Sequence, residues 1–178
     1  LLTSKLQPAE ASSALYAYAR ASYIQDMGIF DHLVSLTASM ADQCTARQLS
    51  QSLWSCGKMV EFEQIEFDED KAVRSPPYLE NAISIAQELC SRSNELTSAD
   101  VTQCIWALAR LGVRDDSILH PLTARAMAIA NSMNTIEATN ILWGLGKIRY
   151  IDLDLTSILT EKLTKTPRQA SPKQAASA

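Results

Sequence analysis

Polar and apolar positions recur in a fixed order around four aromatic residues of this chain. These residues are Tyr16, Trp54, Trp106 and Trp143, which are 38, 52 and 37 residues apart. Each has an acid or amide six residues before it and a base four residues after it. A period of this size is typical of helical-repeat arrays. Such an array presents a binding surface, so the pattern favours a binding protein over an enzyme.

The same pattern predicts two helices in each unit. At about 100° per residue, the positions two and five residues on either side of the aromatic lie on one apolar face, which we expect to pack on the second helix. Pairs such as Thr45 with Gln48 and Thr97 with Asp100 resemble capping boxes at the starts of the first helices. The first helices are expected at 8–20, 46–59, 98–111 and 135–148, and the second helices at 29–42, 77–93, 116–131 and 153–166.

The predicted fold is all-α: an α-solenoid of about four helix-hairpin repeats of 37–40 residues. The array covers residues 1–166, and the second repeat is the longest. Its excess lies at 60–76, with an acidic run at 61–70 and the breaker Ser75-Pro76-Pro77. Residues 167–178 have no apolar periodicity, and we expect a disordered tail. The repeats are expected at about 7–43, 44–95, 96–133 and 134–166.

Positions next to the aromatic separate into small and polar groups. One and three residues after it the side chains are small, as in Ala107, Gly57 and Gly146, which suits closely stacked first helices. The opposite side carries an amide three residues before the aromatic, a hydroxyl four before and a base four after, and we expect these to form one polar ridge. The amides are Gln51, Gln103 and Asn140, with Ser13 in the first repeat, and the bases are Arg20, Lys58, Arg110 and Lys147.

Each group on this ridge has two interpretations. The Trp residues pack neighbouring repeats together, or they are platforms on which nucleic-acid bases stack. The bases complete the dipole of each helix C-terminus, or they contact phosphates at one per repeat. The amides are solvated, or they read base edges, as side chains do in helical-repeat RNA binders.

Net charge appears at first to exclude a nucleic-acid partner. The chain carries 16 bases and 20 acids, for a net charge of −4. Six of the acids lie within residues 61–70, so the rest of the chain has 14 acids against 16 bases. The acidity is therefore local. The acidic run is interpreted as a solvated loop, or as a contact for a basic protein partner.

No catalytic, metal or membrane signature accompanies the repeats. The four Cys residues have no C-x-x-C spacing, and we interpret them as small buried residues in a reducing compartment. His32 and His120 have no partnered carboxylate pattern, so we assign them structural roles. Phosphate loops, zinc-protease motifs and nucleophile elbows are missing from the sequence, and so are apolar runs of the roughly 18 residues that span a bilayer. We expect no catalytic residues, metal or cofactor and no membrane partner.

Two stretches of the chain resemble a known repeat class. TSADVTQCIWALARLGVRDDSILHPL and IEATNILWGLGKIRYIDLDLTSIL are similar to units of octotricopeptide and heptatricopeptide proteins. These repeats are related to those of RAP-domain and FAST-kinase-like organellar RNA-binding proteins. The resemblance covers about residues 8 to 166 and is clearest in the third and fourth repeats. It implies binding of organellar ribosomal or messenger RNA, as a non-catalytic scaffold or a component of a divergent mitochondrial ribosome.

The sequence therefore leads to two hypotheses. The first is an RNA-binding or RNA-scaffolding protein of the mitochondrion, or alternatively of the plastid, held among neighbouring proteins of a larger assembly. Its candidate RNA-binding residues are Arg20, Lys58, Arg110, Lys147, Gln51, Gln103 and Asn140. The alternative is a protein–protein interaction scaffold that docks a partner through its concave face or its acidic loop.

Overall fold

The computed structural model describes residues 6–60 and 75–165, and these ranges are all-α. They contain eight α-helices and three short 3₁₀ turns, and no strand lies within them. The predicted all-α class is confirmed. The helices are α1 (Pro8–Ala21), α2 (Met27–Ser39), α3 (Ala46–Met59), α4 (Leu79–Ser91), α5 (Ser98–Leu111), α6 (Asp116–Ala128), α7 (Thr135–Lys147) and α8 (Leu153–Lys165).

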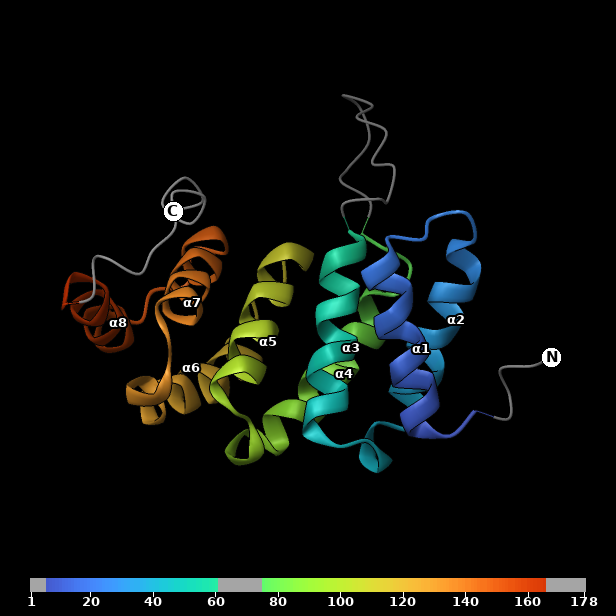
Figure 1. Ribbon diagram of the computed structural model, residues 1–178, viewed down its shortest axis with the longest axis horizontal. Coiled ribbons are helices and arrows are strands. Elements are labelled where there is room, and N and C mark those ends of the chain that lie inside the picture. Colours follow the sequence, from blue (N-terminus) through green and yellow to red (C-terminus); the bar gives the residue numbers. More distant parts are fainter. Residues whose placement is uncertain (1–5, 61–74, 166–178) are drawn as a thin grey trace, which may run out of the picture.

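The helices pack in two rows. Helices α1, α3, α5 and α7 contact one another in chain order and form the first row. Helices α2, α4, α6 and α8 do the same in the second row, and each helix also contacts its chain neighbour across the rows, as α1 contacts α2. The molecule therefore extends in chain order from the α1–α2 end to the α7–α8 end (Figure 1).

Capping chemistry explains where the first-row helices start. At α3, the Gln48 backbone N–H donates to the Thr45 hydroxyl at 3.2 Å, and the Thr45 N–H donates to the Gln48 side chain at 2.8 Å. Reciprocal bonds of this kind satisfy two N–H groups that have no partner within the helix. The same box occurs at all four starts, in the pairs Gln7 and Glu10, Thr45 and Gln48, Thr97 and Asp100, and Asn134 and Glu137.

The second-row helices end earlier than the sequence predicts. Helix α2 stops at Ser39, α4 at Ser91 and α6 at Ala128, and each is followed by a 3₁₀ turn. These turns are Ala41–Gln43, Ser93–Glu95 and Ala130–Ser132. Ala41 and Ala130 remain buried in their turns, so the apolar pattern continues past the end of the α-helix. The hydrophobic periodicity therefore gave no signal for these helix ends.

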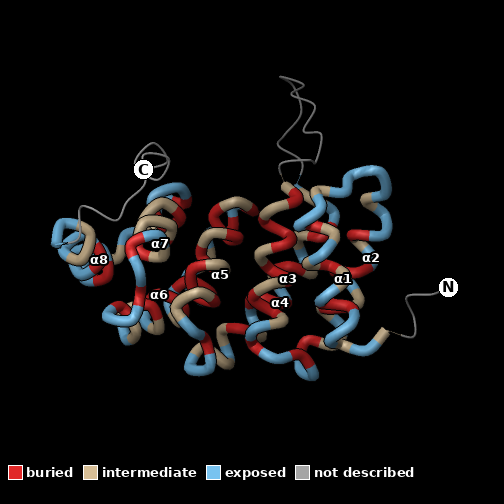
Figure 2. Tube along the Cα trace, in the orientation of Figure 1, coloured by how far each residue is buried: buried red, intermediate tan, exposed pale blue. Residues whose placement is uncertain are grey.

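The predicted apolar face of the first-row helices forms the core. Its members on α3, α5 and α7 are all buried, including Leu49, Leu108 and Ile141. Helix α1 differs, since Tyr18 is only half-buried and Ala21 is exposed. Figure 2 shows buried positions along the interior of both rows. The core is therefore continuous through the middle of the molecule and thinner at the α1 end.

Three predictions fall wholly or partly beyond the described ranges. The acidic run at 61–70, most of the 60–76 insertion and the tail at 167–178 lie outside the described residues. Within the described ranges, the helices are too short and too polar to cross a membrane.

Candidate nucleic-acid interface

The four aromatic side chains form a continuous ladder along the first row. Trp54 and Trp106 have ring centroids 6.2 Å apart and planes 25° from parallel, and Trp106 and Trp143 are 6.5 Å and 28° apart. Tyr16 adjoins Trp54 at 5.4 Å. Aromatic pairs attract each other at such separations. The interpretation that these residues hold neighbouring helices together is confirmed. All four residues are half-buried.

Two of the bases four residues after the aromatics, Arg110 and Lys147, contact this ladder. The Arg110 guanidinium lies 5.8 Å from the Trp106 ring centroid, and the Lys147 ammonium lies 5.2 Å from that of Trp143. Cation–π contacts of this kind hold the charge at the ring face. Lys58 is half-buried in the last turn of α3, and Arg20 is exposed in the last turn of α1. All four bases therefore lie at the negative end of a helix dipole, and Arg110 and Lys147 also contact the ladder.

The amides three residues before the aromatics lie on the same helices as the ladder, about one turn before each ring. Gln51, Gln103 and Asn140 are all half-buried, whereas Ser13 on α1 is exposed. The Gln103 side-chain oxygen is buried and accepts no hydrogen bond from any residue in the described ranges. A buried acceptor without a donor costs about 1–3 kcal/mol. The hydrogen-bonding capacity of this oxygen is therefore unused within the described part of the chain.

The hydroxyls four residues before the aromatics are not part of the ridge, so this prediction is wrong. Ser12, Ser50 and Thr102 are buried, and Thr139 is half-buried. The Ser50 hydroxyl donates to the Arg47 carbonyl and the Thr102 hydroxyl donates to the Ser98 carbonyl, one turn earlier. Ser50 also donates to Asp100 of the adjacent helix α5, so it faces that helix rather than solvent. The ridge therefore consists of amides and bases alone.

The two rows differ in charge. Helices α1, α3, α5 and α7 together carry five bases and three acids, whereas α2, α4, α6 and α8 carry three bases and six acids. The three first-row acids, Glu10, Asp100 and Glu137, all lie in first turns, where they cap their helices. The C-terminal halves of the four first-row helices are therefore positive. They carry Arg20, Lys58, Arg110 and Lys147.

A buried carboxylate fixes the spacing of α3 and α5 under this surface. The Asp100 carboxylate, 2% exposed, accepts hydrogen bonds from Arg47 at 2.8 Å, Ser50 at 2.8 Å and Thr97 at 2.6 Å. Burial alone would raise the pKa of Asp100, but the hydrogen bonds from Thr97, Arg47 and Ser50 outweigh it and lower the pKa. The ion pair with Arg47 was not predicted. Arg47 lies in the first turn of α3, where a base opposes the helix dipole. This position was the signal in the sequence from which an acidic partner for Arg47 could have been predicted.

Glycines allow close approaches both between α3 and α5 and between α5 and α7. A Cβ placed on Gly57 would lie 2.7 Å from the Cα of Ala107, and one on Gly144 would lie 2.9 Å from the Ile105 side chain. The prediction that small residues allow close stacking is confirmed at these two positions. It is wrong for Gly146, which has no atom within 4 Å of a Cβ placed there.

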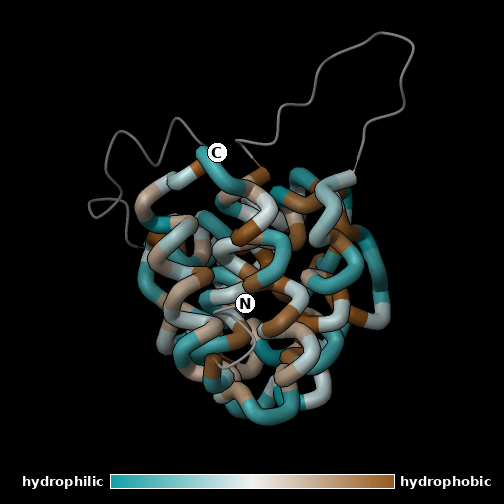
Figure 3. The backbone as a smooth tube through the Cα atoms, turned by 90° about the vertical axis from the view of Figure 1, so that its right-hand side faces the viewer, coloured by the Kyte–Doolittle hydropathy of each residue, from teal (hydrophilic) through white to brown (hydrophobic). Residues whose placement is uncertain are grey.

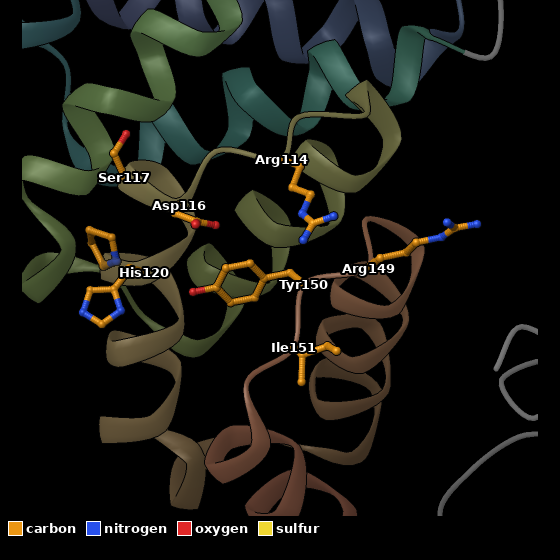
Figure 4. A pocket seen from close by; sticks show the side chains of 8 residues that line it. Arg114, Asp116, Ser117, His120, Arg149, Tyr150 and Ile151 are labelled. Atoms are coloured by element: carbon orange, nitrogen blue, oxygen red, sulfur yellow. The ribbon is translucent and has the colours of Figure 1, made fainter.

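An open pocket of about 720 Å³ lies away from the ladder, between the loops that follow α5 and α7 (Figure 4). Arg114, Asp116, His120 and Tyr150 line it, and the Arg149 guanidinium points away from it. Ser117 donates its hydroxyl to Asp115 at 2.6 Å, as part of the cap of α6. His32 and His120 are both exposed, so neither is a core packing residue. In the described part of the chain, Ser117 is therefore not hydrogen-bonded to His120 as a nucleophile would be to its base.

Comparisons with known proteins do not identify a family. No protein-family model matches the chain, and no curated protein matches it significantly. Within the described ranges, His, Cys, Asp and Glu do not gather in groups of three that could hold a metal ion. The assignment of function therefore depends on the arrangement of the ladder, amides and bases.

Proposed function

We propose that this chain forms an α-solenoid of four helix-hairpin repeats. The surface of its first-row helices binds single-stranded RNA. The observation that carries the proposal is the aromatic ladder, flanked in α3, α5 and α7 by one amide and one base per helix. Helical-repeat proteins read RNA by presenting a few side chains per repeat to each base. The ladder supplies the same combination of groups at each step.

Each group has a distinct role in this proposal. Arg20, Lys58, Arg110 and Lys147 attract the phosphates, and the excess of bases in this row suits the anionic RNA backbone. Gln51, Gln103 and Asn140, which are all half-buried, contact base edges. The half-buried Trp residues offer apolar surface for the bases.

The proposed activity is non-catalytic, as a scaffold or an RNA-binding subunit. The proposed setting is a mitochondrion, or alternatively a plastid, and includes membership of a divergent mitochondrial ribosome. The setting rests on the resemblance to octotricopeptide and heptatricopeptide repeats alone.

A binding assay with a labelled single-stranded RNA oligonucleotide tests the proposal. We expect the combined variant Arg20→Gln, Lys58→Gln and Lys147→Gln to lose at least tenfold in affinity, because three phosphate contacts are removed. Arg110 is kept because its guanidinium packs on Trp106 and its Nε is buried, so replacing it would disturb the packing. The control is Lys165→Gln, an exposed base on α8 in the second row. Equal affinity of the triple variant and the control would refute the first-row surface as the RNA site. Failure of the unaltered chain to bind RNA would favour the protein-scaffold alternative.

A further inference from the structure

The pocket between the loops that follow α5 and α7 collects polar side chains that the proposed RNA surface does not use. Arg114 comes from the first of these loops, Asp116 and His120 from α6, and Tyr150 from the second loop. The pocket volume of about 720 Å³ is in the range of sites that hold small ligands. Residues from separate parts of the sequence therefore converge on one open space of ligand size.

Two of these side chains have opposite charges and are nevertheless unpaired. Within the described ranges, neither the Arg114 guanidinium nor the Asp116 carboxylate makes an ion pair or a hydrogen bond with another residue. Figure 4 shows both charged groups turned toward the space that the Tyr150 phenol enters. The pocket therefore offers a free acceptor group and a free donor group beside an aromatic ring.

The same pocket presents apolar surface. Tyr150 is half-buried and packs against the core, and its backbone N–H donates to the Leu145 carbonyl at 2.9 Å. These contacts hold the ring in place at the end of α7. Ile151, the next residue, lines the pocket and is 81% exposed. A fixed aromatic ring beside an exposed apolar side chain suits a ligand that has a flat aromatic body.

These groups together select the chemistry of the ligand. The Asp116 carboxylate would repel an acidic peptide, and the Arg114 guanidinium would repel a basic one. A nucleotide suits both groups, because its base is flat and carries N–H donors while its phosphate is anionic. Among the four RNA bases, only guanine has two adjacent donors on its Watson–Crick edge, N1–H and the 2-amino group. A carboxylate accepts from both at once.

We propose that this pocket binds a guanine nucleotide. The Tyr150 ring stacks on guanine, the Asp116 carboxylate accepts from N1–H and the 2-amino group, and the Arg114 guanidinium donates to the phosphate. The two loops follow directly on the helix ends that carry Arg110 and Lys147, so a guanosine of a bound RNA strand can supply the base. The RNA source rests on the proposed function, whereas binding of a free guanine nucleotide does not.

Isothermal titration calorimetry of the full chain with guanosine, adenosine and inosine monophosphates tests this inference. We expect the guanosine compound to bind about tenfold more tightly than the adenosine compound. The inosine compound lacks the 2-amino group and should bind with intermediate affinity. Equal affinities for the guanosine and adenosine compounds would overturn the inference.

The variant Asp116→Asn tests the assignment of the carboxylate. It should lose the preference for guanine and bind xanthosine monophosphate instead, because an asparagine amide donates to the 2-carbonyl of xanthine and accepts from N1–H. A gain of xanthine binding cannot result from unfolding. Asp154→Asn, which changes an exposed acid in the first turn of α8, is the control and should keep the guanine preference. An unchanged guanine preference in Asp116→Asn would overturn the inference.

A pair of tyrosine variants tests the stacking surface. Tyr150→Leu should weaken binding of guanosine monophosphate about tenfold, because stacking on the base is lost. Tyr23→Leu is the control, since Tyr23 is 43% exposed in the loop between α1 and α2, at the end of the molecule that faces the viewer in Figure 3. Equal losses in the two variants would overturn the inference.

Two RNA strands distinguish the sources of the guanine. An oligouridylate is compared with the same strand carrying a guanosine at each end. Tighter binding of the guanosine strand that disappears in Asp116→Asn identifies RNA as the source, and equal affinity for both strands identifies the free nucleotide. Oligouridylate binding without any preference for guanosine monophosphate overturns this inference alone. Guanosine monophosphate binding without RNA binding supports this inference and contradicts only the proposed RNA function.

Discussion

Gly57 of α3 lies so close to Ala107 of α5 that a Cβ on the glycine would come within 2.7 Å of the Ala107 Cα. The neighbouring atom belongs to the backbone of a buried helix, so it cannot move aside as a flexible side chain would. This contact sets the separation of the two central helices. The ring spacing of Trp54 and Trp106, and with it the geometry of the proposed RNA surface, depends on that separation.

The first prediction compares two helical glycines. Gly57→Ala should destabilise the protein by about 1–3 kcal/mol, because overpacking outweighs the gain in helix propensity. Gly146→Ala should stabilise the protein by about 0.5–1 kcal/mol, since its added methyl meets no atom. Urea denaturation measures both. Equal stabilisation by the two changes would contradict the close packing of α3 and α5.

The second prediction concerns pH. The hydrogen bonds from Thr97, Arg47 and Ser50 keep the folded pKa of Asp100 below its ordinary value despite burial. The stabilisation is therefore fully present above the unfolded pKa of about 4 and is lost as pH falls through the folded pKa. Asp100→Asn should lower the free energy of unfolding near pH 7 by about 1–3 kcal/mol. It should also make that free energy depend less on pH below about 4.

Denaturation curves recorded from neutral to acidic pH provide the check. Glu161→Gln is the control, because Glu161 and its partner Lys165 are both exposed and their pair is screened by solvent. If Asp100→Asn and Glu161→Gln have equal, small effects, the buried network does not stabilise the α3–α5 contact.

The third prediction concerns the turns that follow α1 and α5. Ser22 has a φ of 50° and Gly112 a φ of 71° at equivalent positions, both in the left-handed region. Left-handed backbone costs an ordinary residue about 1–2 kcal/mol. Ser22→Gly should therefore stabilise the protein by about 0.5–1 kcal/mol, and Gly112→Ala should destabilise it by a similar amount. The midpoint temperature of thermal unfolding distinguishes the two variants. Shifts of the same sign would contradict the left-handed conformations of Ser22 and Gly112.

The fourth prediction concerns thiol reactivity. Cys44, Cys56 and Cys104 are buried, and burial raises the pKa of each of these thiols. Cys90 is half-buried, and burial raises its pKa to about 11. At pH 8 only about 0.1% of Cys90 is thiolate, the reactive form. The native chain should react slowly with a thiol reagent at all four positions, and the unfolded chain rapidly. A rapid native reaction at one of them would place that thiol at an accessible site.

The sequence predicted the local features of this fold well, because local chemistry determines them. The first-row helices start at Pro8, Ala46, Ser98 and Thr135, where the sequence places cap residues. The core positions also followed from spacing alone, as Leu49 and Leu108 show. These predictions need only helical geometry and residue type.

The features that were missed depend on which helix lies beside which. The hydrogen bond from Arg47 to Asp100 joins residues 53 apart in the sequence. Ser50 lies at a polar position of the helical wheel, but α5 covers it. Gly57 and Gly146 are the same residue at the same position, yet only one has a neighbouring helix. Helical periodicity describes one helix at a time, so it cannot show these differences.

The salt dependence of RNA affinity tests the central claim most directly. Each phosphate contact with a single strand adds about 0.7 to the slope of log affinity against log salt concentration. The unaltered chain should bind a single-stranded RNA oligonucleotide with a clear negative slope. The variant Arg20→Gln, Lys58→Gln and Lys147→Gln should reduce the magnitude of that slope by about 2. An unchanged slope in the triple variant would contradict the account, because the first-row bases would then make no contact with RNA phosphates.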